Sequence, residues 1–159
     1  MERDLVSIIT ASYNTERFIE ETIKSVQTQT YQNWEMLITD DASTDKTCQI
    51  IESFSKTDSR IKLYRLNTNS GPAVARNNSI NKAKGRFIAF LDADDLWLPD
   101  KLKIQISEMV NKQVDISFSS YLHIDEKGNS LEVEIQAIKH LTYSKLLKNN
   151  YIGNLTGMY

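Results

Sequence analysis

The sequence predicts an α/β, Rossmann-like fold in which a mostly parallel central sheet is flanked by helices. First, strand-like and helix-like segments alternate four times between residues 5 and 112, which favours parallel strands with helices on both faces. Second, residues 87–91 are all apolar, as in a strand that is buried on both faces. Third, the length of 159 residues suits one domain with its own core.

Three strands and two helices are expected in the first 66 residues. The strands comprise residues 5–11, 34–39 and 61–66, and β-branched or alternating composition supports the first and the third. Ile19, Ile23 and Val26 recur at helical spacing, with Asn14 as the expected N-cap. The second helix is expected to have Ser43 as its N-cap. Its buried side is formed by Thr47, Ile50, Ile51 and Phe54.

The alternation is expected to continue to about residue 112 and then to change. A helix over residues 73–84 begins after Pro72 and ends at Gly85, positions that suit a first helical turn and a helix end. The apolar strand follows, and Pro99 begins another helix. The expected later elements are a strand at 115–124, a turn at 125–129, a returning strand at 131–135, a short helix at 141–147 and a strand-like end at 151–159.

Composition argues against several classes of protein. Lys and Arg number 19 and Asp and Glu 21, a net charge of −2, whereas a general nucleic-acid binder needs a strongly basic face. Cys48 is the single cysteine, so an internal disulfide is excluded and a reducing compartment is expected. No apolar run approaches the roughly 20 residues that span a bilayer, and the N-terminus lacks the pattern of a signal peptide. We therefore expect a soluble, cytoplasmic domain.

Three carboxylates, Asp92, Asp94 and Asp95, follow the apolar strand within four positions. Such charges cannot stay unpaired in a core, so the strand must carry them to the sheet edge where ligands of open α/β sheets bind. Carboxylate oxygens suit Mg²⁺ or Mn²⁺ that is shared with a substrate phosphate. The five glycines form neither G-x-G-x-x-G nor a phosphate loop, so a cation is the available partner for a nucleotide diphosphate.

Four blocks of sequence carry a resemblance to a known family. They are residues 6–14, 40–45 (DDASTD), 71–77 (GPAVARN) and 92–99, which begins DADD and ends in Pro99. In this order and spacing, from about residue 5 to 102, the chain resembles the nucleotide-sugar-binding part of the family 2 inverting glycosyltransferases, which have the GT-A fold. It departs at Thr10-Ala11, where the family more often has Pro-Thr.

The resemblance implies a domain organisation and roles for individual residues. One GT-A domain is expected over 1–159, with the nucleotide-sugar-binding part at 1–112 and an incomplete acceptor part at 113–159. Asp94 matches the metal-binding carboxylate of the family's DxD motif, and Asp92 matches the position beside ribose and metal, which implies Mn²⁺ or Mg²⁺ as cofactor. Asp41 matches the carboxylate that accepts a hydrogen bond from the base, for which the ring N–H of uracil is a fitting donor. The other implied donor-binding positions are Ala11, Tyr13, Arg76 and Ala93.

Several of these assignments have a structural alternative. Arg76 is placed to meet the diphosphate or to hold the Asp cluster, yet an arginine on a helix is as often solvated or salt-bridged. Tyr13, expected with Ala11 beside the base, also fits a core aromatic whose hydroxyl reaches the rim. For Asp45, a role at the start of the helix is favoured over a functional one.

In family terms the reaction is a single displacement with inversion. An acceptor hydroxyl attacks the anomeric carbon and the nucleoside diphosphate leaves, with the cation stabilising the charge on the leaving group. The family's general base follows the strand that residues 153–156 resemble, so the base is expected beyond Tyr159. Asp125 and Glu126 are expected at a hairpin tip, and neither is assigned as the base. We therefore expect a truncated chain that binds its donor and turns over poorly.

The family context also suggests the partners. The expected donor is a UDP-sugar and the acceptor a saccharide or a lipid-linked saccharide, in bacterial surface polysaccharide synthesis. The full-length protein is then expected at the inner face of the membrane, as a peripheral protein. These expectations rest on analogy with the family.

Two other function classes are weighed against this one. A non-catalytic nucleotide-sugar-binding module would have the same site without the general base. A phosphoryl-transfer domain also uses Asp clusters at strand ends, but a phosphatase of the haloacid dehalogenase type needs paired Asp after the first strand. Here that strand ends Thr-Ala-Ser-Tyr-Asn, and the acids of a receiver domain are absent as well.

Overall fold

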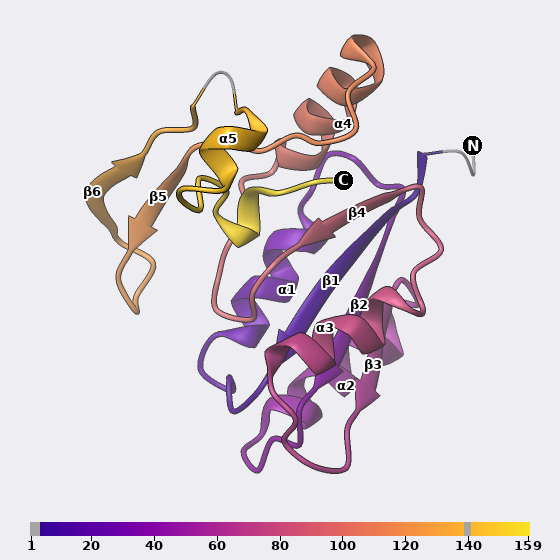
Figure 1. Ribbon diagram of the computed structural model, residues 1–159. Coiled ribbons are helices and arrows are strands. Elements are labelled where there is room, and N and C mark those ends of the chain that lie inside the picture. The colour runs from indigo at the N-terminus through magenta and orange to yellow at the C-terminus, as the bar shows by residue number, and fades with distance from the viewer. Residues whose placement is uncertain (1–3, 139–140) are drawn as a thin grey trace.

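The fold is built on a sheet of four parallel strands (Figure 1). A computed structural model describes residues 4–138 and 141–159. The strands are β1 (Val6–Ser12), β2 (Trp34–Asp40), β3 (Ile61–Arg65) and β4 (Phe87–Phe90), in the order β3-β2-β1-β4. The predicted parallel sheet is therefore confirmed. The direction of winding reverses between β1 and β4, so the switch point of the sheet lies at the carboxyl ends of these strands.

Helices cover both faces of the sheet. They are α1 (Ile19–Gln27), α2 (Thr47–Thr57), α3 (Pro72–Ile80) and α4 (Lys101–Lys112). Right-handed crossovers between parallel strands place α1 and α2 on one face and α3 on the other. In agreement, α1 packs against α2, whereas α3 packs against β1 and β2. No helix among the residues that the structure describes is long and apolar enough to cross a membrane.

The core lies between the sheet and these helices. Ile8, Met36 and Ile38 of the two central strands are fully buried, and Ile23 and Val26 of α1 are buried in the same cluster. These buried residues recur every second position in the strands and every third or fourth position in the helix. This spacing gives each element one continuous apolar face, and these faces pack together. This core fixes the carboxyl ends of β1, β2 and β4 relative to one another.

Strand β4 is covered less completely than the sequence predicts. Phe87 and Ala89 are buried, but Ile88 and Phe90 on the other parity are only half-buried. The end of the chain protects this edge, because the amides of Ile88 and Tyr159 each donate to the other's carbonyl over 2.9 Å. The Tyr159 ring also contacts Phe90 edge-on, with 5.9 Å between centroids. The prediction of complete burial on both faces is wrong for this strand.

Beyond α4 the chain forms a hairpin and several short elements (Figure 1). These are β5 (Tyr121–Ile124), its antiparallel partner β6 (Ser130–Ile135), α5 (Tyr143–Leu146) and the 3₁₀ helix η2 (Asn154–Thr156). The predicted hairpin and short helix are confirmed. The strand expected over 115–124 is shorter, and the end expected to be a strand is η2 followed by isolated bridges from Met158 to Ala89 and Ser117. Long-range pairing decides this segment, and local sequence does not encode it.

The two expected N-caps are wrong, because the residues bind each other's loops. Asn14 has a left-handed φ of 52°, and its side-chain oxygen accepts the amide of Thr44 over 2.9 Å. Ser43 hydroxyl accepts the amide of Asn14, also over 2.9 Å. Helices α1 and α2 begin only at Ile19 and Thr47. The favoured role of Asp45 is confirmed, because its carboxylate accepts the Thr47 amide over 2.9 Å at the start of α2.

Candidate functional site

The candidate site lies at the carboxyl ends of β1, β2 and β4. Ser12 and Asp40 are paired in register at the ends of β1 and β2, and the acidic loop that contains Asp92 follows β4 directly. The parallel sheet therefore brings both acidic segments of the sequence to one edge, as predicted. This is the edge at which open α/β sheets bind ligands.

Asp92 is the centre of a small polar network. Arg76 of α3 donates from Nη2 to Oδ1 of Asp92 over 2.6 Å. Asn154 of η2 donates from Nδ2 to the same oxygen over 2.9 Å. Both side chains of the ion pair are about one-third exposed, 29% for Arg76 and 31% for Asp92. Arg76 was expected either to meet the diphosphate or to hold the Asp cluster, and the structure shows it in contact with the cluster.

Asp94 and Asp95 lie on the turn that follows Asp92. The amide of Asp95 donates to the carbonyl of Asp92 over 3.2 Å, which closes the turn. Asp94 is exposed, whereas Asp95 is half-buried. Burial, and to a smaller extent the nearby charges of Asp92 and Asp94, together raise the pKa of Asp95 to about 6. The turn therefore concentrates negative charge that is compensated only in part by Arg76.

The acidic turn has the donor chemistry of a Mg²⁺ or Mn²⁺ site. Its carboxylate oxygens are the hard ligands that these ions prefer, and Asp92, Asp94 and Asp95 lie within four positions of one turn. Within residues 4–138 and 141–159, no three His, Cys, Asp or Glu side chains form a complete cation cage. The residues present fit an ion that takes its remaining ligands from a substrate phosphate.

Asp41 anchors the loop before α3. It is 2% exposed, and its two carboxylate oxygens accept the amides of Ser70 and Gly71, each over 2.7 Å. Gly71 has φ of 89°, a conformation that glycine adopts without strain. Each carboxylate oxygen keeps a further lone pair, so this anchoring is compatible with a hydrogen bond to a base. The sequence did not reveal the anchoring role, because the two partners are about 30 residues away.

The other predicted donor-site residues lie around the same edge. Tyr13 is 48% exposed, so the alternative of a core aromatic is wrong. Ala11 is half-buried one residue before the end of β1. Ala93 is buried, and its carbonyl accepts the hydroxyl of Thr22 over 3.0 Å. Ala93 therefore ties the acidic turn to α1.

A cavity of about 380 Å³ adjoins the acidic turn. Asp94 and Asp95 line one side, and the β5–β6 hairpin, with His123 and Tyr121, lines another. The hairpin tip itself is engaged in local contacts. Asp125 accepts the amides of Lys127 and Asn129, and Glu126 pairs with Arg17 over 2.5 Å. The expected turn at this tip is thus confirmed.

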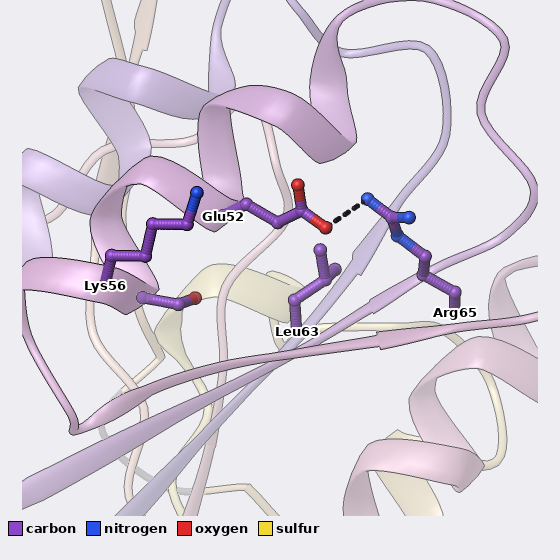
Figure 2. A pocket seen from close by; sticks show the side chains of 5 residues that line it. Glu52, Lys56, Leu63 and Arg65 are labelled. Atoms are coloured by element: carbon purple, nitrogen blue, oxygen red, sulfur yellow. Dashed lines mark hydrogen bonds and ion pairs between the residues drawn. The ribbon is translucent and has the colours of Figure 1, made fainter.

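A larger hollow of about 540 Å³ lies elsewhere, between α2 and the edge strand β3 (Figure 2). Figure 2 shows Glu52 reaching toward Arg65, with which it pairs over 2.6 Å, while Leu63 lies between them. None of the predicted site residues lines this hollow. Its size alone does not make it the functional site, because no group with unusual chemistry converges there.

Asn154 is the site residue that the sequence reasoning did not assign. Residues 153–156 resemble a strand of the family, and no local pattern marks the side-chain amide of Asn154 as a partner of Asp92. The sequence separation of 62 residues explains why. Only the pairing of the chain end with β4 brings Asn154 to the acidic turn.

Comparison with known proteins supports one family. The model of the family described as "Glycosyl transferase family 2" matches residues 7–158. A "Putative teichuronic acid biosynthesis glycosyltransferase TuaG" of Bacillus subtilis is 46% identical over 156 residues, which are 98% of this chain and 62% of that protein. The Escherichia coli "UDP-Glc:alpha-D-GlcNAc-diphosphoundecaprenol beta-1,3-glucosyltransferase WfgD" is 47% identical over 156 residues, 98% of this chain and 60% of that protein. The chain thus spans about three fifths of the length of these relatives.

Solved structures agree with the sequence comparison. S. aureus TarS 1-349 in complex with UDP superposes with a TM-score of 0.67 and 33% identity, over 70% of this chain and 33% of that one. The mannosyltransferase PcManGT of Pyrobaculum calidifontis, in complex with GDP-Man and Mn²⁺, gives a TM-score of 0.66 and 27% identity, over 72% and 34% of the two chains.

Proposed function

Because this chain belongs to glycosyl transferase family 2 and has the GT-A fold, we propose that it binds a nucleotide sugar for transfer to an acceptor hydroxyl with inversion. The observation that carries the proposal is the meeting of Asp41, Arg76 and the acidic turn at one edge of the sheet. A base, a diphosphate and a cation need these three kinds of group within the span of one nucleotide.

The donor that fits best is a UDP-sugar. TarS structures contain UDP or UDP-GlcNAc, and the name of the similar E. coli enzyme specifies UDP-Glc. In the proposal, Asp41 accepts a hydrogen bond from the ring N–H of uracil, while Tyr13 and Ala11 flank the base at the end of β1. The half-exposed ring of Tyr13 leaves an aromatic face available for such a contact.

Asp94 and Asp92 would hold Mn²⁺ or Mg²⁺ against the diphosphate. Mn²⁺ accompanies GDP-Man in the PcManGT structure, which supports the proposal that the acidic turn of this chain also binds a divalent ion. The ion would stabilise the charge that develops on the leaving diphosphate. Arg76 contributes by neutralising part of the charge on Asp92, so that the turn retains net negative charge without the full repulsion of three carboxylates.

The proposed acceptor is a saccharide carried on a lipid. A diphosphoundecaprenol acceptor is named for the similar E. coli enzyme, and teichuronic acid synthesis for the similar B. subtilis protein. We accordingly propose a role in polysaccharide synthesis at the cytoplasmic face of the membrane. Asp125 and Glu126 are not proposed as the general base, because contacts within the hairpin tip and with Arg17 already occupy them.

A non-catalytic donor-binding module remains the second candidate, since no carboxylate has been assigned as the base. Binding and turnover distinguish the two. We expect UDP to raise the melting temperature when Mn²⁺ is present, and Asp94→Ala to remove the part of that rise which depends on Mn²⁺. If UDP does not raise the melting temperature in the presence of either Mn²⁺ or Mg²⁺, the donor site is wrongly assigned. Sugar transfer from a UDP-sugar to an acceptor would exclude the module.

A further inference from the structure

Asp92 is held by two residues that come from distant parts of the chain. Arg76 of α3 and Asn154 of η2 both donate to Oδ1, over 2.6 and 2.9 Å. Within the described part of the chain, no hydrogen bond to Oδ2 accompanies them. We propose that Asn154 is a positioning residue of the donor site, which fixes the Asp92 carboxylate with Oδ2 left for the nucleotide sugar or its cation. This inference rests on the proposed function.

The segment that carries Asn154 is anchored from several sides. The indole Nε1 of Trp97 donates to the carbonyl of Leu155 over 2.8 Å, and Nε2 of Gln105 donates to the carbonyl of Thr156 over 2.9 Å. The amide and carbonyl of Met158 pair with Ser117, each over 2.9 Å. Because these contacts fix the backbone of η2, the amide of Asn154 reaches Asp92 from a preorganised position. Little entropy is then lost on making the hydrogen bond.

The chemistry of an amide suits this position better than that of a charged group. Arg76 already supplies one positive charge to Asp92, and a second cation at position 154 would repel a divalent ion at the same carboxylate. A carboxylate at position 154 would add a fourth negative charge to the turn. The neutral Nδ2 group of Asn154 holds the oxygen without changing the charge of the site.

A purely structural role for Asn154 makes a different prediction from positioning. If the side chain only fills space in η2, the isosteric Asn154→Asp variant would keep its affinity for UDP and Asn154→Ala would lose affinity. If the side chain positions Asp92, Asn154→Asp loses more affinity than Asn154→Ala, because the hydrogen-bond donor is replaced by a like charge. The rank order of the two UDP affinities therefore separates the roles.

The test is calorimetric titration of the chain with UDP in the presence of Mn²⁺. We expect Asn154→Ala to weaken binding roughly tenfold or more, as for one hydrogen bond to a carboxylate, and Asn154→Asp to weaken it further. The matched control is Asn111→Ala, at an exposed position of α4 whose side-chain amide donates to the hydroxyl of Ser107, and it should bind UDP as the parent chain does.

A double-mutant cycle guards against a general effect on folding. In an Asp92→Asn background, Asn154→Ala should have no further effect on UDP affinity, because the group that it positions is already altered. Additive effects, or an Asn154→Asp variant that binds UDP normally, would overturn the inference. If the unaltered chain itself fails to bind UDP with Mn²⁺, the proposed function is wrong and this inference falls with it.

Discussion

Arg76 on α3 and Asp92 after β4 form an ion pair of 2.6 Å across the carboxyl edge of the sheet. The pair links the helix on one face of the sheet to the acidic turn at the switch point. Asp92 is one of the two carboxylates proposed to hold the cation, and Arg76 is its partner. The pair is therefore placed to affect ligand binding more than stability, since partly exposed ion pairs contribute little to folding.

Arg76→Ala should lower the affinity for UDP with Mn²⁺ by about tenfold, as expected for loss of a charge-assisted hydrogen bond. Arg76→Lys should lose less, because it keeps the positive charge but not the guanidinium geometry. Isothermal titration measures both. Equal affinity for the unaltered chain and Arg76→Ala would show that the ion pair has no part in donor binding.

Asp41→Asn should destabilise the fold, because the backbone amides of Ser70 and Gly71 both donate to the Asp41 carboxylate. In the variant, one of these amides would face an NH₂ group, which cannot accept its hydrogen bond. The expected cost is about 1–3 kcal/mol in the free energy of unfolding, the range for a buried unsatisfied group. Urea denaturation measures it. Asp115→Asn is the control, because Asp115 is an exposed carboxylate and should change little. Equal stability of the two variants would contradict the anchoring role of Asp41.

Asp58 should give the fold a pH-dependent stability. Its hydrogen bonds with Arg60 lower its pKa to about 2, with Arg60 Nη2 at 2.8 Å and Gln27 Nε2 at 3.2 Å. The pKa of Asp58 is lower in the folded chain than in the unfolded one, so ionised Asp58 stabilises the fold. This stabilisation is at most about 2 kcal/mol and is fully present at neutral pH. This stabilisation declines as the pH falls through the ordinary pKa of 3.8 and is lost as the pH falls below about 2.

The difference in unfolding free energy between the parent chain and Asp58→Asn tests this. Urea titrations at pH 6 and pH 3 should show the difference shrinking by about half at the lower pH. Asp125→Asn offers a comparison at an exposed turn, where solvent weakens the effect. A difference between the parent and Asp58→Asn that does not change with pH would contradict the lowered pKa of Asp58.

Gly85→Ala should destabilise the fold by about 1–3 kcal/mol through overpacking. A Cβ atom at this position would lie 2.6 Å from both the carbonyl oxygen of Leu5 and the amide nitrogen of Ser7. These are backbone atoms at the start of β1, so neither moves without disturbing the sheet. Gly128→Ala is the opposite case, because nothing lies within 4 Å of its new Cβ and only its positive φ of 79° opposes the substitution. Normal stability of Gly85→Ala would show that the loop before β4 can move away from the start of β1 without cost.

Local pattern predicts most of the first half of the fold. The β-branched composition of β1 and the spacing of Ile19, Ile23 and Val26 specify their elements without help from tertiary contacts. The loops after these strands could not be predicted in the same way. Asn14 and Ser43 are good caps by composition, yet each binds the other's loop, because the parallel sheet brings the loops together.

The candidate site follows the same division. The acidic turn could be located from sequence because charge directly after a buried strand must reach the sheet edge. The partners of its side chains come from far along the chain, with Asn154 62 residues from Asp92 and Ser70 29 residues from Asp41. Pairing of Met158 with Ala89 and Ser117 decides where Asn154 lies, and no short-range pattern contains that information.

The most direct measurement is a crystal structure of the chain with UDP and Mn²⁺, with the metal located by its anomalous scattering. We expect the Mn²⁺ peak at a carboxylate oxygen of Asp94, with the ion bridging to the diphosphate and the uracil ring beside Asp41. A peak remote from the acidic turn, or UDP bound in the hollow between α2 and β3, would contradict this expectation.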